Sequence, residues 1–311
     1  MSPSSSTSSS DGEPGRAPAR RWFLGTLLPI LAALAALFAW NYVLDPFGMN
    51  GRFPLGLDRA GVTRVLNYRL YKTIEFARAP RPAIVLGDSR CDLFRAESFA
   101  HAGRRDVYNL SFGGGTLAEA VDAFWFADAR TALREVFFCV PFSLYNGSAA
   151  SNLVPEALAL QHPRIGYYLS PFVAKAGFEL LYARATGRLL HPEKPPLSRE
   201  AFWVHQLGPE VAGTLASWRP PGPLDVRLAE VAAHCRARGI KLTFVIPPNH
   251  VELQAKVDEL GLREPYETMK RRLAELAPVV DLDRPSPLTE DAANYLDPYH
   301  LTPAAAESVV R

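Results

Sequence analysis

The sequence predicts an α/β fold with three layers, in which a five-stranded parallel sheet lies between helices, together with one transmembrane helix near the N-terminus. Short apolar runs recur along the chain, and such runs are typical of strands that are covered on both faces. Helical stretches rich in Ala, Leu, Glu and Arg lie between them, and this alternation favours parallel strands in a flavodoxin-like sheet. The predicted strands cover residues 83–86, 107–111, 136–142, 242–247 and 279–283, and the main helices cover 116–133, 224–238 and 250–276.

The predicted transmembrane helix covers residues 22–44, which include no charged side chain. This apolar run is long enough to cross the ~30 Å hydrocarbon core of a bilayer. Arginines lie just before it and tryptophans lie near both of its ends, as at membrane interfaces. The positive-inside rule then predicts a single-pass protein of the cytoplasmic membrane, with its N-terminus in the cytoplasm and its main domain periplasmic or extracellular. A cleaved signal peptide is the alternative interpretation.

The rest of the chain divides by composition. Residues 1–21 form a Ser-rich stretch that we expect to be a disordered cytoplasmic tail. Residues 45–82 read as a connector with one helical patch and no assigned chemistry, and residues 83–311 form the main domain. Within that domain, an insertion at about 145–223 is rich in Pro, His and aromatic residues. We expect it to form a lid or a wall of the substrate site.

Charge and cysteine content exclude several classes of function. The 34 basic and 32 acidic side chains leave a net charge of +2, which gives no basic surface for nucleic acid. The three cysteines, Cys91, Cys139 and Cys235, are odd in number and widely spaced, so we predict neither a disulfide framework nor a zinc site. Cys139 lies in an apolar run and reads as core packing. The histidines lack the spacing of metal ligands, and we predict no metal and no cofactor.

A polar corner follows the first predicted strand, in the stretch AIVLGDSR. Ligands of parallel sheets bind beyond the carboxyl ends of the strands, so Ser89 is delivered to the place where a site is expected. Gly87 permits a tight turn, and Ser89 would begin the next helix, where N–H groups favour developing negative charge. The alternative is an ordinary turn and helix cap formed by Asp88 and Ser89.

A candidate base and its orienting acid occur near the C-terminus, in NYLDPYHLTP. Pro298 disfavours helix at Asp297, so Asp297 and His300 belong to a loop, where the carboxylate can fold under the imidazole. The acid would hold the tautomer that leaves Nε2 free for a serine proton. An ordinary helix start capped by Thr302 is the alternative, but the serine after the first strand and this pair after the last favour a triad.

Oxyanion donors are predicted after the second strand, in NLSFGGGT at 109–116. Glycines allow backbone N–H groups to approach a reacting carbonyl without obstruction by side chains. A phosphate-binding loop is the competing interpretation. It is disfavoured because no lysine follows and the GxGxxG spacing is absent.

These three motifs together resemble the SGNH (GDSL-like) hydrolase superfamily, from about residue 83 to the C-terminus outside the insertion. The resemblance implies that Ser89 is the nucleophile and also donates an oxyanion N–H, and that Gly114 is the second donor. Asp297 and His300 would complete the triad. The third motif departs from the family pattern, because no Gly-x-Asn-Asp follows the third strand, and Asn146 is the candidate for the side-chain amide.

Further features resemble exported SGNH-like proteins that acylate cell-envelope polymers, namely the alginate O-acetylation and teichoic-acid D-alanine transfer proteins. These features are the anchor, GDSR in place of GDSL, and the run FVIPPNH. The resemblance implies acyl transfer, above all acetyl transfer, to a polysaccharide, with a membrane-bound acyltransferase as partner. An esterase or deacetylase with the same triad is the first alternative, and a non-catalytic envelope scaffold is the second.

Two further residues are candidates for substrate binding. Arg90 adjoins the nucleophile and would either bind an anionic substrate or pair with an acid. His250 follows a predicted strand and would either contact substrate or simply begin a helix.

Overall fold

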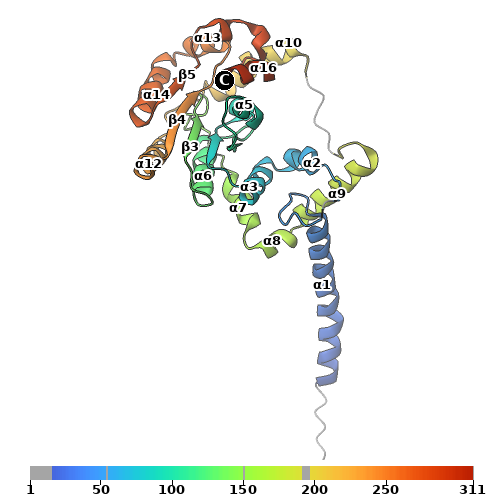
Figure 1. Ribbon diagram of the computed structural model, residues 1–311. Helices are drawn as coiled ribbons and strands as arrows, with labels where there is room; N and C mark the ends of the chain where they lie inside the picture. Colours follow the sequence, from blue (N-terminus) through green and yellow to red (C-terminus); the bar gives the residue numbers. More distant parts are fainter. Residues whose placement is uncertain (1–15, 54, 150, 191–196, 311) are drawn as a thin grey trace, which may run out of the picture.

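The computed structural model describes residues 16–53, 55–149, 151–190 and 197–310, with the side chains of 16–20 excepted (Figure 1). Most of the expected disordered tail, residues 1–15, lies outside the described residues. Disorder was also expected for 16–21, and there the expectation is wrong, because these residues form the first turns of helix α1.

The core of the main domain is a five-stranded sheet with all neighbouring strands parallel and the order β2-β1-β3-β4-β5. This order is the flavodoxin-like one, so the fold class predicted from the sequence is confirmed. The strands are β1 (Ala83–Leu86), β2 (Val107–Asn109), β3 (Glu135–Cys139), β4 (Lys241–Ile246) and β5 (Val279–Asp281).

Helices cover both faces of this sheet. Successive side chains of a strand point to opposite faces, so one strand contacts both helical layers. Ile84 and Leu86 face one helical layer, and Val85 faces the other. All three side chains are fully buried. The first layer contains α6 (Leu117–Asp128), α12 (Pro223–Arg238) and α14 (Arg263–Leu276), and the second contains α5 (Ala96–His101) and α16 (Pro303–Val310).

Two of the predicted helices are divided in the structure. The helix expected at 250–276 consists of α13 (Val251–Glu259) and α14, and Gly261 lies between them with a φ of 69° that ends the first helix. In the connector, α2 (Arg59–Leu66) and α3 (Tyr68–Arg78) are separated by Asn67, which is extended and caps α3 through Leu70 N–H.

Helix α1 (Arg16–Leu44) projects from the body of the molecule (Figure 1). Its segment Arg21–Leu44 is long and apolar enough to cross a membrane, as either an anchor or a signal sequence. The last turns of α1 pack on the domain: Asn41 Nδ2 donates hydrogen bonds to the carbonyls of Tyr168 and Ser170, at 2.8 and 3.0 Å.

The insertion has two parts with different positions. The first, α7 (Val154–Gln161), α8 (Arg164–Tyr168) and α9 (Pro171–Thr186), packs with the connector and the end of α1 around a separate apolar core. The second part lies at the sheet edge where the site is built and lines the cavity there, together with Ala149 and Ser151 from the start of the insertion. It consists of α10 (Arg199–His205), a π-helical turn η1 (Gln206–Glu210) and α11 (Val211–Thr214).

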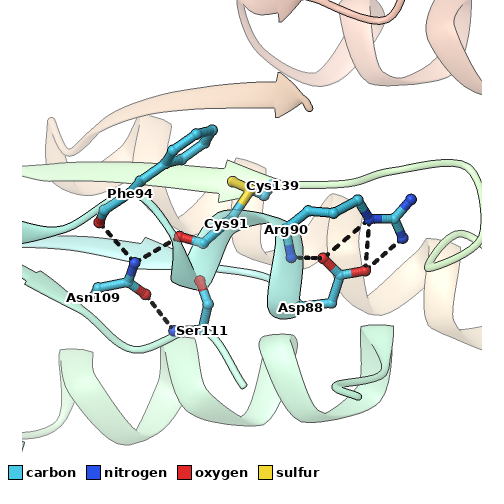
Figure 2. Close-up of a disulfide and its surroundings, with 7 residues drawn as sticks. All are labelled: Asp88, Arg90, Cys91, Phe94, Asn109, Ser111 and Cys139. Carbon is cyan, nitrogen blue, oxygen red and sulfur yellow. Dashed lines mark hydrogen bonds and ion pairs between the residues drawn. A yellow bond between two sulfur atoms is a disulfide. The ribbon is translucent and has the colours of Figure 1, made fainter. Parts of the chain in front are cut away.

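Two cysteines that we expected to be unpaired form a disulfide, so the interpretation of Cys139 as plain core packing is wrong. Cys91 in helix α4 (Ser89–Asp92) is bonded to Cys139 at the end of β3, with their Cα atoms 6.4 Å apart (Figure 2). Because 48 positions separate them, only the parallel pairing of β1 with β3 brings them together. Cys235 is free and buried.

Candidate active site

Ser89 is the first residue of helix α4, directly after the turn that leaves β1. The turn requires a glycine, because Gly87 has a φ of +146° and a Cβ there would lie 2.7 Å from the Cβ of Cys139. Asp88 caps the helix by accepting a hydrogen bond from Arg90 N–H at 3.0 Å. The helix is therefore capped by Asp88 and not by its neighbour Ser89, so the Oγ of Ser89, the candidate nucleophile, takes no part in the cap.

The C-terminal loop brings His300 and Asp297 to Ser89. Ser89 Oγ lies 2.7 Å from His300 Nε2, and His300 Nδ1 lies 2.8 Å from Asp297 Oδ2. The second carboxylate oxygen of Asp297 accepts the N–H groups of Tyr299 and His300, at 2.8 and 3.2 Å. The carboxylate is thereby fixed beneath the ring and favours a proton on Nδ1, which leaves Nε2 to accept the serine proton.

This loop is a short antiparallel pair, β6 (Tyr295–Asp297) and β7 (His300–Leu301), that follows α15 (Pro287–Glu290) and the 3₁₀ turn η2 (Ala292–Asn294). His250 stabilises it, because its backbone N–H donates to Pro298 O at 2.9 Å. The His250 ring is buried against Trp203 and Tyr295 and its Nδ1 caps α13. His250 does not line the cavity beside Ser89, so the expected substrate contact is not found and the helix-start alternative fits.

Two backbone N–H groups are available to stabilise an oxyanion. Ser89 N–H lies in the first turn of α4, where no intrahelical acceptor exists. Gly114 has a φ of +61° in the Gly-rich turn. Among the described residues neither N–H has a hydrogen-bond acceptor, and both residues line one cavity of about 350 Å³ together with His300. The cavity thus brings together the Ser89 hydroxyl, the His300 ring and two backbone N–H groups that have no acceptor among the described residues.

Asn146, the candidate for the third oxyanion donor, is not brought into this site. Its Nδ2 donates to Thr214 O at 2.9 Å, and its Oδ1 accepts the N–H groups of Ser148 and Arg219. The chain turns sharply after β3, with Tyr145 N–H bonded to Pro141 O, and this turn directs Ser143 rather than Asn146 toward the cavity. Asn146 instead ties the loop to the insertion.

Arg90 lines the cavity but its charge is already paired. The guanidinium contacts both oxygens of Asp88, with Nε 3.1 Å from Oδ2 (Figure 2). It also donates to Asn249 Oδ1 and Ser143 Oγ. The guanidinium carbon of Arg90 lies 5.4 Å from the centre of the Tyr299 ring. Of the two alternatives for Arg90, pairing with an acid is therefore the one observed.

Behind Arg90, the carboxylate of Asp283 is also buried. Asn249 donates through its backbone and side chain to Asp283, at 2.9 and 2.7 Å, and Gln254 and Tyr266 also donate to this carboxylate. Burial raises the pKa of Asp283, while these hydrogen bonds act in the opposite direction. We call Asp88, Arg90, Asn249 and Asp283 the buried network.

Sequence reasoning missed the contribution of the connector. Lys72 of α3 is buried, and its Nζ donates to Ser111 O at 2.6 Å and contacts Asp92 at 2.5 Å. Arg69, one turn earlier, donates to Gly114 O at 3.2 Å and forms a salt bridge of 2.9 Å with Glu119. Helix α3 therefore helps to position both α4, the helix that begins at Ser89, and the Gly-rich turn that contains Gly114. No local pattern marks these residues, because each contact joins distant parts of the chain.

Comparisons with known proteins give distant likenesses of fold. No family model and no curated protein matches the chain. A structure assigned as a platelet activating factor from Streptococcus pneumonia has 11% identity and a TM-score of 0.40, covering 81% of this chain and 92% of its own. An acylhydrolase from Bacteroides fragilis has 12% identity and a TM-score of 0.36, covering 79% and 98%.

A third structure, a GDSL-like lipase from Bacteroides thetaiotaomicron, has 12% identity and a TM-score of 0.38, with coverage of 79% and 93%. GDSL-like hydrolases are the class that the sequence motifs resemble.

Proposed function

We propose that the chain is a serine-dependent acyl-ester enzyme of the SGNH type, in which Ser89 is acylated. The observation that carries this proposal is the unbroken series from Ser89 to His300 to Asp297, with contacts of 2.7 and 2.8 Å, beside two unoccupied N–H donors. A serine hydroxyl becomes a nucleophile when an oriented base takes its proton, and oxyanion donors then stabilise the tetrahedral intermediate.

The reaction proceeds in two halves. Ser89 Oγ attacks the donor carbonyl while its proton moves to His300 Nε2, and Asp297 stabilises the imidazolium. The N–H groups of Ser89 and Gly114 hold the oxyanion, and its collapse expels the donor's leaving group, which takes the proton. In the second half an acceptor hydroxyl gives its proton to His300 and attacks acyl-Ser89. Collapse of this second tetrahedral intermediate breaks the bond between the acyl carbon and Ser89 Oγ, releases the new ester, and returns the proton from His300 to Ser89 Oγ, which restores the free enzyme.

The acyl group is proposed to be short, with acetyl the leading candidate, and the acceptor to be a hydroxyl of an envelope or secreted polysaccharide. The cavity of about 350 Å³ supports a short acyl group, because most of its lining residues are polar or glycine and few large apolar side chains line it among the described residues. Water as acceptor would make the same residues an esterase or deacetylase. The resemblance to envelope-acylating proteins leads us to propose a membrane-bound acyltransferase as the source of the acyl group.

We further propose that α1 is retained as an anchor and that the domain lies outside the cytoplasm. The packing of the end of α1 supports retention, since Phe38 contacts the ring of Tyr168 at 5.0 Å and Asn41 holds two carbonyls of the insertion. The Cys91–Cys139 disulfide supports export, because disulfides persist in oxidising compartments.

Labelling of the detergent-solubilised full chain with a fluorophosphonate probe tests the proposed nucleophile. Wild-type protein should label, Ser89→Ala should not, and Ser308→Ala, which removes a hydroxyl in α16, should label as wild type. Folded wild-type protein that takes up no probe would favour the scaffold alternative.

Incubation with p-nitrophenyl acetate and oligosaccharides then separates transfer from hydrolysis. Acetylated sugar detected by mass spectrometry supports transfer. Acetate without acetylated sugar at every acceptor concentration would assign the site to an esterase.

A further inference from the structure

One face of the second part of the insertion lines the cavity beside Ser89 and His300. It presents Gln206, Glu210 and Thr214, which follow one another at intervals of four residues. Residues at this spacing share a helix face. The π-helical turn Gln206–Glu210 lies at this place in the helix, and such turns are frequent at functional sites. We call these three residues the insertion wall.

Two members of the insertion wall have polar groups that the protein leaves unmatched. Gln206 is only 9% exposed, yet within the described part of the chain its side-chain amide has no hydrogen-bond partner. Glu210 is exposed, and its carboxylate forms neither a salt bridge nor a hydrogen bond with any described residue. Thr214, in contrast, donates its hydroxyl to Glu210 O at 2.8 Å. The amide atoms of Gln206 are not among the side-chain atoms closed off from solvent, so they can hydrogen-bond to water or to a ligand in the cavity.

The charges that line the cavity are unequal. The guanidinium of Arg90 is neutralised by Asp88, with which it forms a buried salt bridge of 2.5 Å. Glu210 has no such partner among the described residues, so the paired ions and Glu210 together give the cavity lining one net negative charge. A like charge on a ligand would be repelled, and a hydroxyl would find an acceptor.

We propose that Gln206 and Glu210 form a subsite for the alcohol part of the ester, which binds hydroxyl groups of a neutral polyol and disfavours anionic alcohols such as uronates. This subsite rests on the proposed function, since it requires acyl-Ser89 chemistry in the same cavity. The same contacts hold the alcohol as acceptor in transfer and as leaving group in hydrolysis. The subsite is therefore measurable in the hydrolytic direction whichever acceptor is natural.

The test compares two esters of matched size on the full chain in detergent: O-acetylated cellotriose, which is neutral, and O-acetylated trigalacturonate. Wild-type kcat/KM should be about tenfold higher for the neutral ester, a preference of about 1.4 kcal/mol, because the carboxylate of Glu210 repels the like charge of the uronate. Glu210→Gln, which keeps the shape and removes the charge, should reduce this preference by about five- to tenfold. Glu230→Gln removes a charge from the exposed side of α12 and should leave the preference unchanged.

Gln206→Ala supplies a second readout. Loss of its hydrogen bonds should raise KM for both sugars about fivefold with a smaller change in kcat, as expected when binding is weakened equally in the ground and transition states. If Gln206→Ala does not fold, the Glu210→Gln preference alone decides. The subsite is overturned if Glu210→Gln leaves the preference unchanged, or if Glu230→Gln alters it as much. Wild-type protein that hydrolyses neither ester and takes no fluorophosphonate would overturn the proposed function and the subsite together.

Discussion

Two groups of polar residues share the carboxyl edge of the sheet, and they differ in whether their hydrogen bonds are complete. Ser89 and His300 lie at the cavity, His300 has 25% of its side chain exposed, and the N–H of Ser89 has no acceptor among the described residues. The buried network, by contrast, pairs Arg90 with Asp88 and surrounds Asp283 with four donors. Unfilled hydrogen-bonding groups at a cavity indicate chemistry, whereas buried groups whose hydrogen bonds are complete indicate support.

This contrast predicts that substitutions at Ser89 and His300 change the rate of the reaction, and that substitutions in the buried network change the stability of the fold. The substitutions below break or sharpen that division, beginning with the largest expected effect.

Ser89→Ala removes the nucleophile and should lower hydrolysis of p-nitrophenyl acetate by about 10³-fold or more. The thermal unfolding midpoint of the full chain in detergent should stay within a degree or two of wild type, because His300 is the one hydrogen-bond partner of the Ser89 side chain among the described residues. A large fall in the midpoint would place Ser89 among the supporting residues instead.

Asp297→Asn keeps the size of the acid and removes its charge. The asparagine amide can no longer favour the proton on Nδ1 and stabilise the imidazolium, so kcat should fall by roughly 10²–10⁴-fold. The pre-steady-state rate of fluorophosphonate labelling measures this change. A rate within twofold of wild type would show that the 2.8 Å contact between Asp297 and His300 has no role in activating the serine.

Asp283→Ala should act on stability. It leaves the donors of Asn249 and Gln254 without their acceptor in a fully buried place, and breaking such a group costs about 3 kcal/mol. The thermal midpoint should fall by several degrees. Asp258→Ala is the control, since Asp258 forms an exposed ion pair with Arg263 that is worth less than about 1 kcal/mol. Equal effects of the two substitutions would contradict the distinction.

The contribution of Lys72 to the stability of the fold depends on pH. Burial lowers the pKa of Lys72 from 10.5 to about 8, although Asp92 opposes the shift. Between these values the unfolded chain binds more protons at this site than the folded protein, so Lys72 makes stability rise as pH rises from 8 to 10.5. The difference in thermal midpoint between wild type and Lys72→Met should therefore change in favour of wild type across this window. A difference that is constant with pH would show that Lys72 keeps an ordinary pKa.

Asn146→Ala should have the smallest effect on rate, within about twofold, because the Asn146 amide is bonded to Thr214 O and Asn146 does not line the cavity. Its hydrogen bonds to the insertion make a modest loss of stability the expected result, roughly 1–3 kcal/mol. A fall in rate of a hundredfold with an unchanged midpoint would restore Asn146 as an oxyanion donor.

The parts of the fold and site that the sequence predicted are those with local signals. Each strand is built on a short apolar run. Ser89 and Gly114 lie in the turns after β1 and β2, and His300 lies in the short C-terminal loop. The order of these motifs along the chain was enough to bring them together, because parallel strands place their carboxyl ends at one edge.

The parts that escaped prediction depend on long-range geometry. The Cys91–Cys139 disulfide has no spacing signature, and the contacts of Arg69 and Lys72 with the site cross from the connector to other elements. The sequence placed Asn146 at the cavity, but the turn after β3 determines which side chain enters it. Ser143 lines the cavity, and Asn146, three residues later, contacts the insertion instead.

Trapping of the covalent intermediate tests the central claim most directly. Full-length protein in detergent is mixed with p-nitrophenyl acetate, quenched in acid during the first turnover and digested, and the peptides are mapped by mass spectrometry. An acetyl group on Ser89, absent from the His300→Ala variant at the same time point, is the predicted result. Turnover of the ester with no acetyl on Ser89, or with the acetyl on another residue, would contradict the account.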